Sequence, residues 1–593
     1  MKNTFYPSLI FFLLFLQFSQ VKAQTVTIYR GGVALTPVYT TIKAAVAGTI
    51  DNDSMVLSAD TFREQNIIID KSLIIEGSSS ATVKSTIDPG ATADSSVFKL
   101  INSDFPVVSH TLTLRNMDII NGKANNGLDS GGGAIFAGIG TILKLNGLMK
   151  LANNHAPDSS AGFAGSRNGG AIYSEGEVYV TSYDVVFENN SAVNGGSIYS
   201  TNKLVLDFWV KLNNSTASLN GGAIYTSGIV QILGESAIFA SKAVNGGGCY
   251  ADNAQLYIKG NTHFDLNHVT KLGAGLFLKN TYCKISDSAE FYGNQTDSNI
   301  AAVIFSTGNN DVQISGANFM YNRCTDMTFT GRGMTVYNDA APGASSIFRI
   351  NNSRIFNPRF DNSRHNEFYN AQAVSAFLSD STWWGESDTS GLIYNVPSAT
   401  VGFRSWIVCE WTLNGGLPVG YSSSFPLEAY FKLYTGAAIP SRMFWMLSGY
   451  FSSDSGSFSP SVVAMPASNI IGSVFSVPMT TGGVNLLATI DADTFKKAVY
   501  VQGTGIKEHK IRSQKMSIFP NPAIDILTIN CTEIKEGRAR VKITDISGRA
   551  LINDVIYFSN SQSKIPLNLQ GGYYILEIET PENKKYSQAL IVQ

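Results

Sequence analysis

The chain has 593 residues, of which 15% are charged, and its formal net charge at pH 7 is −2. This near-neutral balance excludes a basic stripe for nucleic acid and a polybasic or amphipathic helix for a membrane surface. The 54 glycines indicate a chain with many tight turns.

Residues 1–23 have the features of a secretory signal peptide. Lys2 precedes a short apolar stretch at residues 9–16, and Ala23 provides a small-residue cleavage site before Gln24. The apolar stretch is too short to cross a bilayer, and no other segment is long and apolar enough. The residue directly after the cleavage site is Gln24 and not a cysteine, so we expect no lipid anchor. Cleavage between Ala23 and Gln24 is therefore expected to release a mature chain without a transmembrane span.

The next part, residues 24–409, contains a sequence repeat. The pattern GGAIY occurs at residues 169–173, returns as GGSIY at 195–199, and occurs again at 221–225. Its aromatic residue recurs every 25 to 28 residues, at Tyr173, Tyr199, Tyr225, Tyr250, Phe277 and Phe305. A fixed period of this size is the signature of a solenoid. Each period holds three short strands between Gly, Asn or Ser turns, which predicts one coil of a parallel β-helix.

A second motif, Phe-x-x-Asn, alternates with the first. Its asparagines are Asn190, Asn267, Asn294 and Asn322. We expect each Phe to point into the coil and the Asn side chains to stack as a hydrogen-bonded ladder at about 4.8 Å spacing. The alternative is a row of asparagines that binds sugar.

The two alternating motifs, over about residues 131–322, resemble the repeats of chlamydial polymorphic outer-membrane proteins and related bacterial surface adhesins. The resemblance implies a right-handed β-helix. It does not extend to an autotransporter barrel. Residues 39–77 look like the N-terminal coils of pectin-lyase-like β-helices, in which a short amphipathic helix, here around residues 42–47, caps the first coil.

At the far end of the β-helix, Trp383 and Trp384 stand side by side in the sequence STWWG. This resembles the closure of the last coil in many bacterial surface β-helices, so we expect the two rings to plug the coil end. A platform for stacking sugar is the alternative.

Cys249, Cys283, Cys324, Cys409 and Cys531 are odd in number and lack CxxC spacing, so they give no zinc site and no disulfide framework. We expect the first three to be buried free thiols, with a bridge between Cys249 and Cys283 as the alternative. No cofactor is expected.

Residues 410–502 contain further alternating strands between turn signals, which predicts an immunoglobulin-like β-sandwich acting as a spacer. Residues 503–514 are polar and are expected to form a linker. Residues 515–593 predict a small C-terminal β-sandwich, since short strands are separated by Asn-Pro, Ser-Gly and Gly-Gly turns.

This last segment resembles the type A sorting domain of the type IX secretion system of Bacteroidota. The residues that carry the resemblance are Phe519, Pro520, Asn521, Pro522, Asp525, Asp545, Gly548, Arg549, Gly571, Gly572 and Tyr573. The resemblance implies export by the type IX machinery, removal of the domain, and attachment to the surface of a Gram-negative cell or release. An ordinary immunoglobulin-like module without a sorting role is the alternative.

Many pectin-lyase-like β-helices are enzymes, so we looked for catalytic groups. A glycosidase needs two converging carboxylates, and the Asp-Asp pair of polygalacturonase-like enzymes does not occur. The scattered candidates are expected at coil corners, and each histidine is expected to be solvated and isolated. These candidates are Asp118, Asp184, Asp207, Asp265, Asp287 and Asp311, then Arg115, Arg167, Arg323, Arg332 and Arg349, and finally His110, His155, His263 and His268. His263 and His268 share one coil without an evident third metal ligand.

Two functions remain. The first, which we favour, is a non-enzymatic, adhesin-like surface protein that binds a glycan or a host-surface partner. The second is a polysaccharide lyase or glycoside hydrolase with a groove along the β-helix. Acids clustered with Arg or Lys in a cleft would favour the enzyme, and the insertion at residues 151–168 is the best place for such a cleft. The catalytic residues, if any, are not identified by the sequence.

Overall fold

We describe the protein from a computed structural model. The description covers residues 24–593, apart from 79–83, 105, 107, 126–130, 158–166, 301–302, 326–331, 340–343, 359–365, 372–375, 386–391, 396–399, 404–406, 414–418, 421–423, 434–447, 465–469, 478–481, 492 and 503–514. The predicted signal peptide with Ala23 and the predicted linker lie outside the described residues. Among the described residues, no helix is both long enough and apolar enough to span a membrane.

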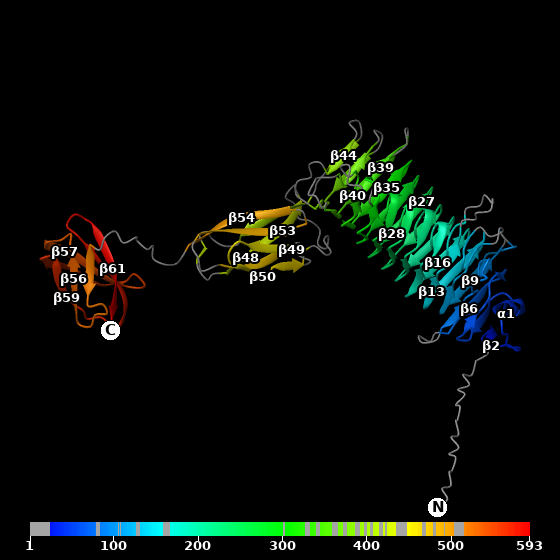
Figure 1. Cartoon of the computed structure of the whole chain (residues 1–593), viewed down its shortest axis with the longest axis horizontal. Coiled ribbons are helices and arrows are strands. Elements are labelled where there is room, and N and C mark those ends of the chain that lie inside the picture. Colours follow the sequence, from blue (N-terminus) through cyan, green and yellow to red (C-terminus); the bar gives the residue numbers. More distant parts are fainter. Residues whose placement is uncertain are drawn as a thin grey trace, which may run out of the picture. The chain divides into compact units, whose positions relative to one another are not determined.

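The first part of the chain is a parallel β-helix, as predicted (Figure 1). One coil consists of β16 (Glu177–Thr181), β17 (Val185–Glu188), β18 (Ser191–Asn194) and β19 (Ile198–Ser200). Each of these four strands belongs to a different sheet: β16 to sheet A, β17 to sheet B, β18 to sheet D and β19 to sheet C. Sheets A, B, D and C have 15, 11, 7 and 12 strands, respectively. Sheet A starts with β2 (Val33–Ala34), β1 (Val26–Arg30) and β3 (Asp53–Leu57) and ends with β45 (Thr400–Phe403).

The coils stack in register because equivalent residues pair from coil to coil. Ile172 pairs with Ile198, and Ile198 pairs with Ile224 of β23 (Ile224–Thr226). Alternate residues of each strand point inward, and the apolar ones form one continuous core along the β-helix. The next residue along each strand points outward, so the repeat places equivalent side chains above one another on both faces.

Both sequence motifs have structural roles. The phenylalanines at Phe264, Phe291 and Phe319 are fully buried, and their ring centroids stack 4.9 Å apart. The predicted asparagine ladder is confirmed, since Asn267 donates to Asn294 and Asn294 donates to Asn322, each through its side-chain amide at 3.0 Å. These asparagines are buried, which rules them out as a row that binds sugar.

The paired glycines are required at a tight corner. Gly195 has φ +63°, and a Cβ there would lie 2.2 Å from the carbonyl oxygen of Ile198. Only glycine fits this backbone without displacing the next strand. The Tyr that follows points outward and stacks on its equivalents over sheet C, at centroid separations of 4.4 to 5.8 Å. This aromatic column comprises Phe136, Tyr173, Tyr199, Tyr225, Tyr250, Phe277, Phe305, Tyr337, Tyr369 and Tyr394.

The predicted N-terminal cap is confirmed as α1 (Ile42–Gly48). Thr41 caps the helix by accepting a hydrogen bond from the Ala44 amide. Ile42 and Val46 are buried in the core of the β-helix. The helix therefore covers apolar residues that the first coil would otherwise expose.

The two tryptophans close the β-helix, although not as one plug. Trp384 packs in the β-helix core, while Trp383 packs in the core of the following β-sandwich. Neither can serve as a sugar platform, because they are only 3% and 0% exposed. The Trp383 indole donates to Asp491 at 2.7 Å, and the Arg354 guanidinium contacts the same carboxylate. The sandwich thus covers the end of the coil through a buried polar contact.

The following segment consists of two antiparallel sheets, which agrees with the predicted immunoglobulin-like architecture. One sheet has the order β46 (Ile407–Leu413), β48 (Ser424–Leu433), β52 (Ile470–Ser476) and β50 (Ser457–Ser459). The other has the order β47 (Val419–Gly420), β54 (Asp493–Gln502), β53 (Gly482–Ile490), β49 (Ser448–Ser453) and β51 (Val462–Ala464). Its role as a spacer stays a prediction.

The C-terminal unit, Gln502–Gln593, has its own core. Its strands are β55 (Met516–Phe519), β56 (Ile526–Cys531), β57 (Glu536–Asp545), β58 (Ala550–Ser559), β59 (Gln562–Pro566), β60 (Gly572–Glu579) and β61 (Lys585–Val592). They form one continuous sheet in the order β55-β56-β59-β58-β57-β60-β61. A β-bridge links Ala523, which lies between β55 and β56, to Val592 at the end of β61, so the two ends of the sheet meet. The two layers of the predicted sandwich are therefore two parts of one curled sheet.

The contact at Asp491 gives a test of the fold. We expect Asp491→Ala to lower the free energy of unfolding of the β-helix and sandwich by about 3 kcal/mol, since it removes the carboxylate shared by the buried Arg354 and Trp383. The control is Asp454→Ala, which removes an exposed carboxylate that accepts from Asn485. This change should alter the free energy of unfolding by less than about 1 kcal/mol. Equal effects in denaturant titrations would contradict this role of Asp491.

Candidate functional site

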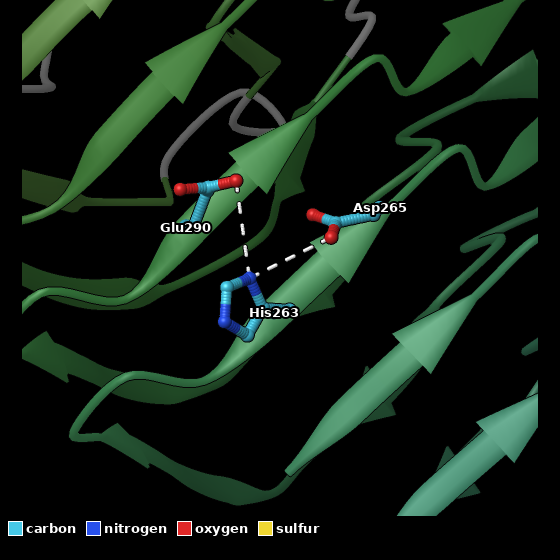
Figure 2. A group of neighbouring side chains, drawn as sticks. All are labelled: His263, Asp265 and Glu290. Carbon is cyan, nitrogen blue, oxygen red and sulfur yellow. Dashed lines mark ion pairs between the residues drawn. The ribbon is translucent and has the colours of Figure 1, made fainter. Parts of the chain in front are cut away.

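The outer face of sheet B brings three metal-ligating side chains together. His263 and Asp265 point outward from β29 (His263–Asp265), on either side of the inward Phe264. Glu290 begins the next strand of the sheet, β33 (Glu290–Tyr292), and pairs in register with His263. Figure 2 shows Nδ1 of His263 facing both carboxylates. We call these three residues the sheet B triad.

The sheet B triad is compact and partly shielded from solvent. Nδ1 of His263 lies 3.6 Å from an oxygen of Asp265 and 3.8 Å from an oxygen of Glu290. The three ligand atoms all lie within 4.8 Å of one another. The side chains are 26%, 22% and 11% exposed for His263, Asp265 and Glu290.

The carboxylates control the protonation of this histidine. Asp265 and Glu290 raise the pKa of His263 to about 10, although partial burial acts in the opposite direction. Burial also raises the pKa of Asp265, against the influence of the nearby imidazolium. At neutral pH, without a bound ion, His263 is therefore a cation facing two acids.

A second cluster lies where sheets A and B meet. Tyr183, Phe208 and Trp209 come from the corner turns of two neighbouring coils and are 57%, 41% and 43% exposed. The Tyr183 ring lies 5.2 Å from the Phe208 ring and 5.8 Å from the Trp209 ring, measured between centroids. We call these three residues the corner aromatic cluster. Asp184 and Asp207, two of the predicted acids, border it in the sequence.

Phe208 in this cluster has an unfavourable backbone conformation. Its φ is +68°, at a corner where other coils place Asn116, Gly147, Asp184, Gly234 and Gly260. A bulky residue in the left-handed region costs about 1–2 kcal/mol. Strain of this kind is found at functional sites, so the exposed ring at Phe208 is a candidate contact for a ligand.

A cavity of about 480 Å³ lies beside the insertion that the sequence singled out. Its lining includes Arg63, Asp88, Lys123 and His155. Arg63 is ion-paired to Asp88, and Nδ1 of His155 lies 2.5 Å from the Ser191 hydroxyl. Burial lowers the pKa of His155, which keeps its imidazole neutral at neutral pH. This cavity combines an acid, two basic groups and a neutral histidine.

The expectation that the acids and histidines lie at coil corners is wrong for most of them. Of the acids, Asp184 and Asp287 are at corners with positive φ, while the others lie in the strands β10 (Met117–Ile120), β20 (Lys203–Asp207), β29 and β36 (Asn310–Ser315). The histidines are in β9 (His110–Arg115), β14 (His155–Ala156), β29 and β30 (His268–Leu272). The physical reason is that every second strand residue of a β-helix faces solvent, so a strand accepts polar side chains as readily as a corner. His110 differs, since it is buried at the start of β9.

The predicted arginines form no row along one face. Arg349 is ion-paired to Asp311 at 2.6 Å, and the buried Arg167 donates to the carbonyl of Ala124. Arg115 ends β9, Arg323 donates to Gln295, and Arg332 lies over the Tyr369 ring. Asp118 accepts from Lys84. These contacts link neighbouring coils and bring no pair of acids together.

The prediction of buried thiols is confirmed for Cys249 and Cys283 and is wrong for Cys324, which is only half-buried. Cys249, Cys283, Cys409 and Cys531 are buried, Cys324 is half-buried, and none of these five cysteines forms a disulfide. Burial raises the pKa of Cys249 to about 12, which makes it unreactive. The alternative bridge between Cys249 and Cys283 is not formed.

The residues of the sorting motif hold turns of the C-terminal sheet. The Asn521 side chain donates to the carbonyl of Ala589 and accepts from the amide of Ile591, which fixes the loop of Pro520 and Pro522 to β61. Asp545 accepts from the Ser547 hydroxyl at 2.6 Å and from the Arg549 amide at 3.0 Å, and Gly548 supplies a positive φ of 87° in this turn. The backbone carbonyl of Asp525 accepts from the Leu567 amide, and Gly571 and Gly572 lead into β60. The side chains of Phe519 and Tyr573 are exposed, at 47% and 70%.

Two family models match parts of the chain. Residues 517–593 match the secretion system C-terminal sorting domain, and residues 184–201 match the Chlamydia polymorphic membrane protein repeat. The chain is a cargo of the type IX secretion system. It is a secreted or cell-surface protein of Bacteroidota, with a β-helix as its passenger. An immunoglobulin-like module without a sorting role is thereby excluded.

The chain is also similar to a curated protein, the endo-acting ulvan lyase of Formosa agariphila. The two are 26% identical over 114 residues, which is 19% of this chain and 22% of the lyase. The match therefore spans about a fifth of the lyase.

Among solved structures, the Yersinia pseudotuberculosis adhesin InvE aligns at 11% identity with a TM-score of 0.14, covering 32% of this chain and 58% of InvE. A C-terminal intimin fragment in complex with the intimin-binding domain of Tir aligns at 10% identity with a TM-score of 0.17, covering 31% and 62%. Scores this low carry no argument about function.

The two histidine environments give a test by pH. We expect the ring of His155 to titrate below pH 6.5 and that of His263 near pH 10, as followed by histidine ring NMR signals. Because the folded pKa of His263 is raised, its stabilising contribution is fully present below pH 6.5 and is lost as the pH rises toward 10. Titration of both rings near 6.5 would contradict these environments.

Proposed function

We propose that this secreted β-helix is an adhesin-like protein that binds glycan at the corner aromatic cluster. The observation that carries the proposal is the group of three exposed rings at Tyr183, Phe208 and Trp209, held across two coils. Aromatic faces contribute a large contact area at little loss of side-chain freedom, and they pack against the apolar faces of sugar rings.

Two further observations support this site. Phe208 keeps its ring exposed in spite of an unfavourable φ of +68°, which has no evident benefit for folding. Asp184 and Asp207 adjoin the rings in the sequence, and carboxylates are good acceptors for sugar hydroxyls. One oxygen of Asp207 already accepts from the Phe208 amide, at 2.7 Å. The resulting site is an open surface, as expected for binding a chain of sugars from its side.

The cavity beside His155 favours a second function, a uronate lyase. A neutral His155 could take the proton from C5 of a uronate, and Arg63 or Lys123 could hold its carboxylate. Departure of the glycosidic oxygen from C4, with a proton taken up from solvent, would then leave a C4–C5 double bond. The similarity to an ulvan lyase supports this alternative, although it covers only 22% of that enzyme.

The test is a glycan array probed with the purified chain, followed by affinity measurements on the glycan that binds. We expect Trp209→Ala to weaken binding about tenfold or more, since it removes one of the three exposed rings that form the site. Tyr450→Ala, which removes a 58% exposed ring from the sandwich, is the matched control and should bind like the unaltered chain. Equal binding by Trp209→Ala would contradict the proposed site.

The same glycan preparations separate the two functions. A rise in ultraviolet absorbance from unsaturated products, abolished in His155→Gln and kept in His268→Gln, would establish the lyase and overturn the non-enzymatic proposal. No absorbance change together with Trp209-dependent binding is the result that we expect.

A further inference from the structure

The sheet B triad differs from an ordinary ion pair in its spacing. Direct hydrogen bonds between nitrogen and oxygen measure about 2.7–3.2 Å. In the same coil, Nε2 of His268 lies at such a distance from Asp297, 2.8 Å. Nδ1 of His263, by contrast, is 3.6 and 3.8 Å from its two carboxylate partners. The three groups converge without touching.

This spacing fits atoms arranged around a metal ion. Nitrogen and oxygen ligands lie about 2.0–2.2 Å from a tetrahedral zinc ion, which places them about 3.3–3.6 Å from one another. Nδ1 of His263 lies close to this separation from each carboxylate, and all three ligand atoms fall within 4.8 Å of one another. We propose that His263, Asp265 and Glu290 form a binding site for a divalent transition-metal ion.

The hydrogen bonding of the carboxylates supports the same conclusion. Glu290 is only 8% exposed as a residue, and its ion pair with His263 at 3.8 Å is too long for a hydrogen bond. One carboxylate oxygen of Asp265 is fully buried and accepts no hydrogen bond from the described residues. Buried carboxylate oxygens are normally satisfied, so this oxygen of Asp265 is placed to accept a ligand that is itself positively charged.

The ligand types select the ion. One imidazole nitrogen with two carboxylates suits Zn²⁺ and similar first-row ions, whereas Ca²⁺ prefers a full shell of oxygens. Two carboxylates and a neutral imidazole also balance a divalent charge. Three protein ligands leave at least one coordination position open, which is typical of zinc sites that bind a further molecule.

The open side of the site faces solvent, because the triad lies on the outer face of sheet B. In register with Asp265 are Phe239 of β25 (Ala237–Phe239) and Tyr292 of β33, which are 40% and 39% exposed. Two exposed aromatic residues therefore flank Asp265 along the sheet, one in each neighbouring coil. This inference is independent of the corner aromatic cluster, which lies in other coils, at the turns between sheets A and B.

The test is a calorimetric titration of the purified, metal-stripped chain with Zn²⁺, combined with the visible spectrum of Co²⁺ at the same site. We expect one equivalent of zinc to bind, and cobalt to give the strong absorption bands of a low-coordinate site. His263→Gln and Glu290→Gln should each weaken zinc binding at least about tenfold and abolish the cobalt bands.

His268→Gln is the matched control, because His268 is a histidine of the same coil with one carboxylate partner at 2.8 Å. It should bind zinc like the unaltered chain. Far-ultraviolet circular dichroism of every variant checks that the β-helix is intact. The proposal is overturned if the unaltered chain binds no zinc at millimolar concentration, or if an intact His263→Gln variant keeps the same affinity and cobalt spectrum.

Discussion

The register between stacked coils is the constraint on which the rest of this structure depends. Parallel strands lie about 4.8 Å apart, and each residue sits above its equivalent one period earlier. Inside the coil, the register is held by stacked Phe rings and by asparagine amides that donate from coil to coil, as between Asn267 and Asn294. Because these interior contacts hold only when equivalent residues align, they also determine which side chains meet outside.

The two outer clusters are products of this register. His263 and Glu290 are far apart in the sequence, yet they pair directly because they occupy the same position in neighbouring coils. Tyr183 reaches Phe208 and Trp209 in the same way, across one coil boundary. In both places the exterior departs from the structural repeat, while the interior beneath it keeps the repeat. A regular core thus allows the surface to vary without loss of the fold.

The sequence predicted the skeleton well and the surface poorly. The Gly-Gly and Phe-x-x-Asn motifs occupy corners and interior positions, where packing limits the choice of residue. Their repetition therefore predicted the β-helix and the asparagine ladder, and the cap at α1 could also be inferred. The exterior has no such pattern. Asp265 alternates with Phe264 and could have been placed outside, and counting one period from His263 would have found Glu290, but no short motif contains all three ligands.

Two other differences have the same origin. The adjacent Trp383 and Trp384 suggested one plug, but the two neighbouring side chains enter different cores. Only the structure reveals that Asp491, more than 100 residues later in the chain, accepts from Trp383. The strain at Phe208 could not be foreseen from sequence either, since its positive φ follows from the corner that the neighbouring coils impose.

The register itself can be measured by cross-linking. His263→Cys combined with Glu290→Cys places two thiols on neighbouring strands at about 4.8 Å between Cα atoms, within the range that a disulfide spans. His263→Cys combined with Asn318→Cys places them two coils apart, at about 9.6 Å, beyond that range. On mild oxidation, we expect mass spectrometry to find the cross-link in the first variant only. A cross-link in the second variant, or in neither, would contradict the register on which both outer clusters depend.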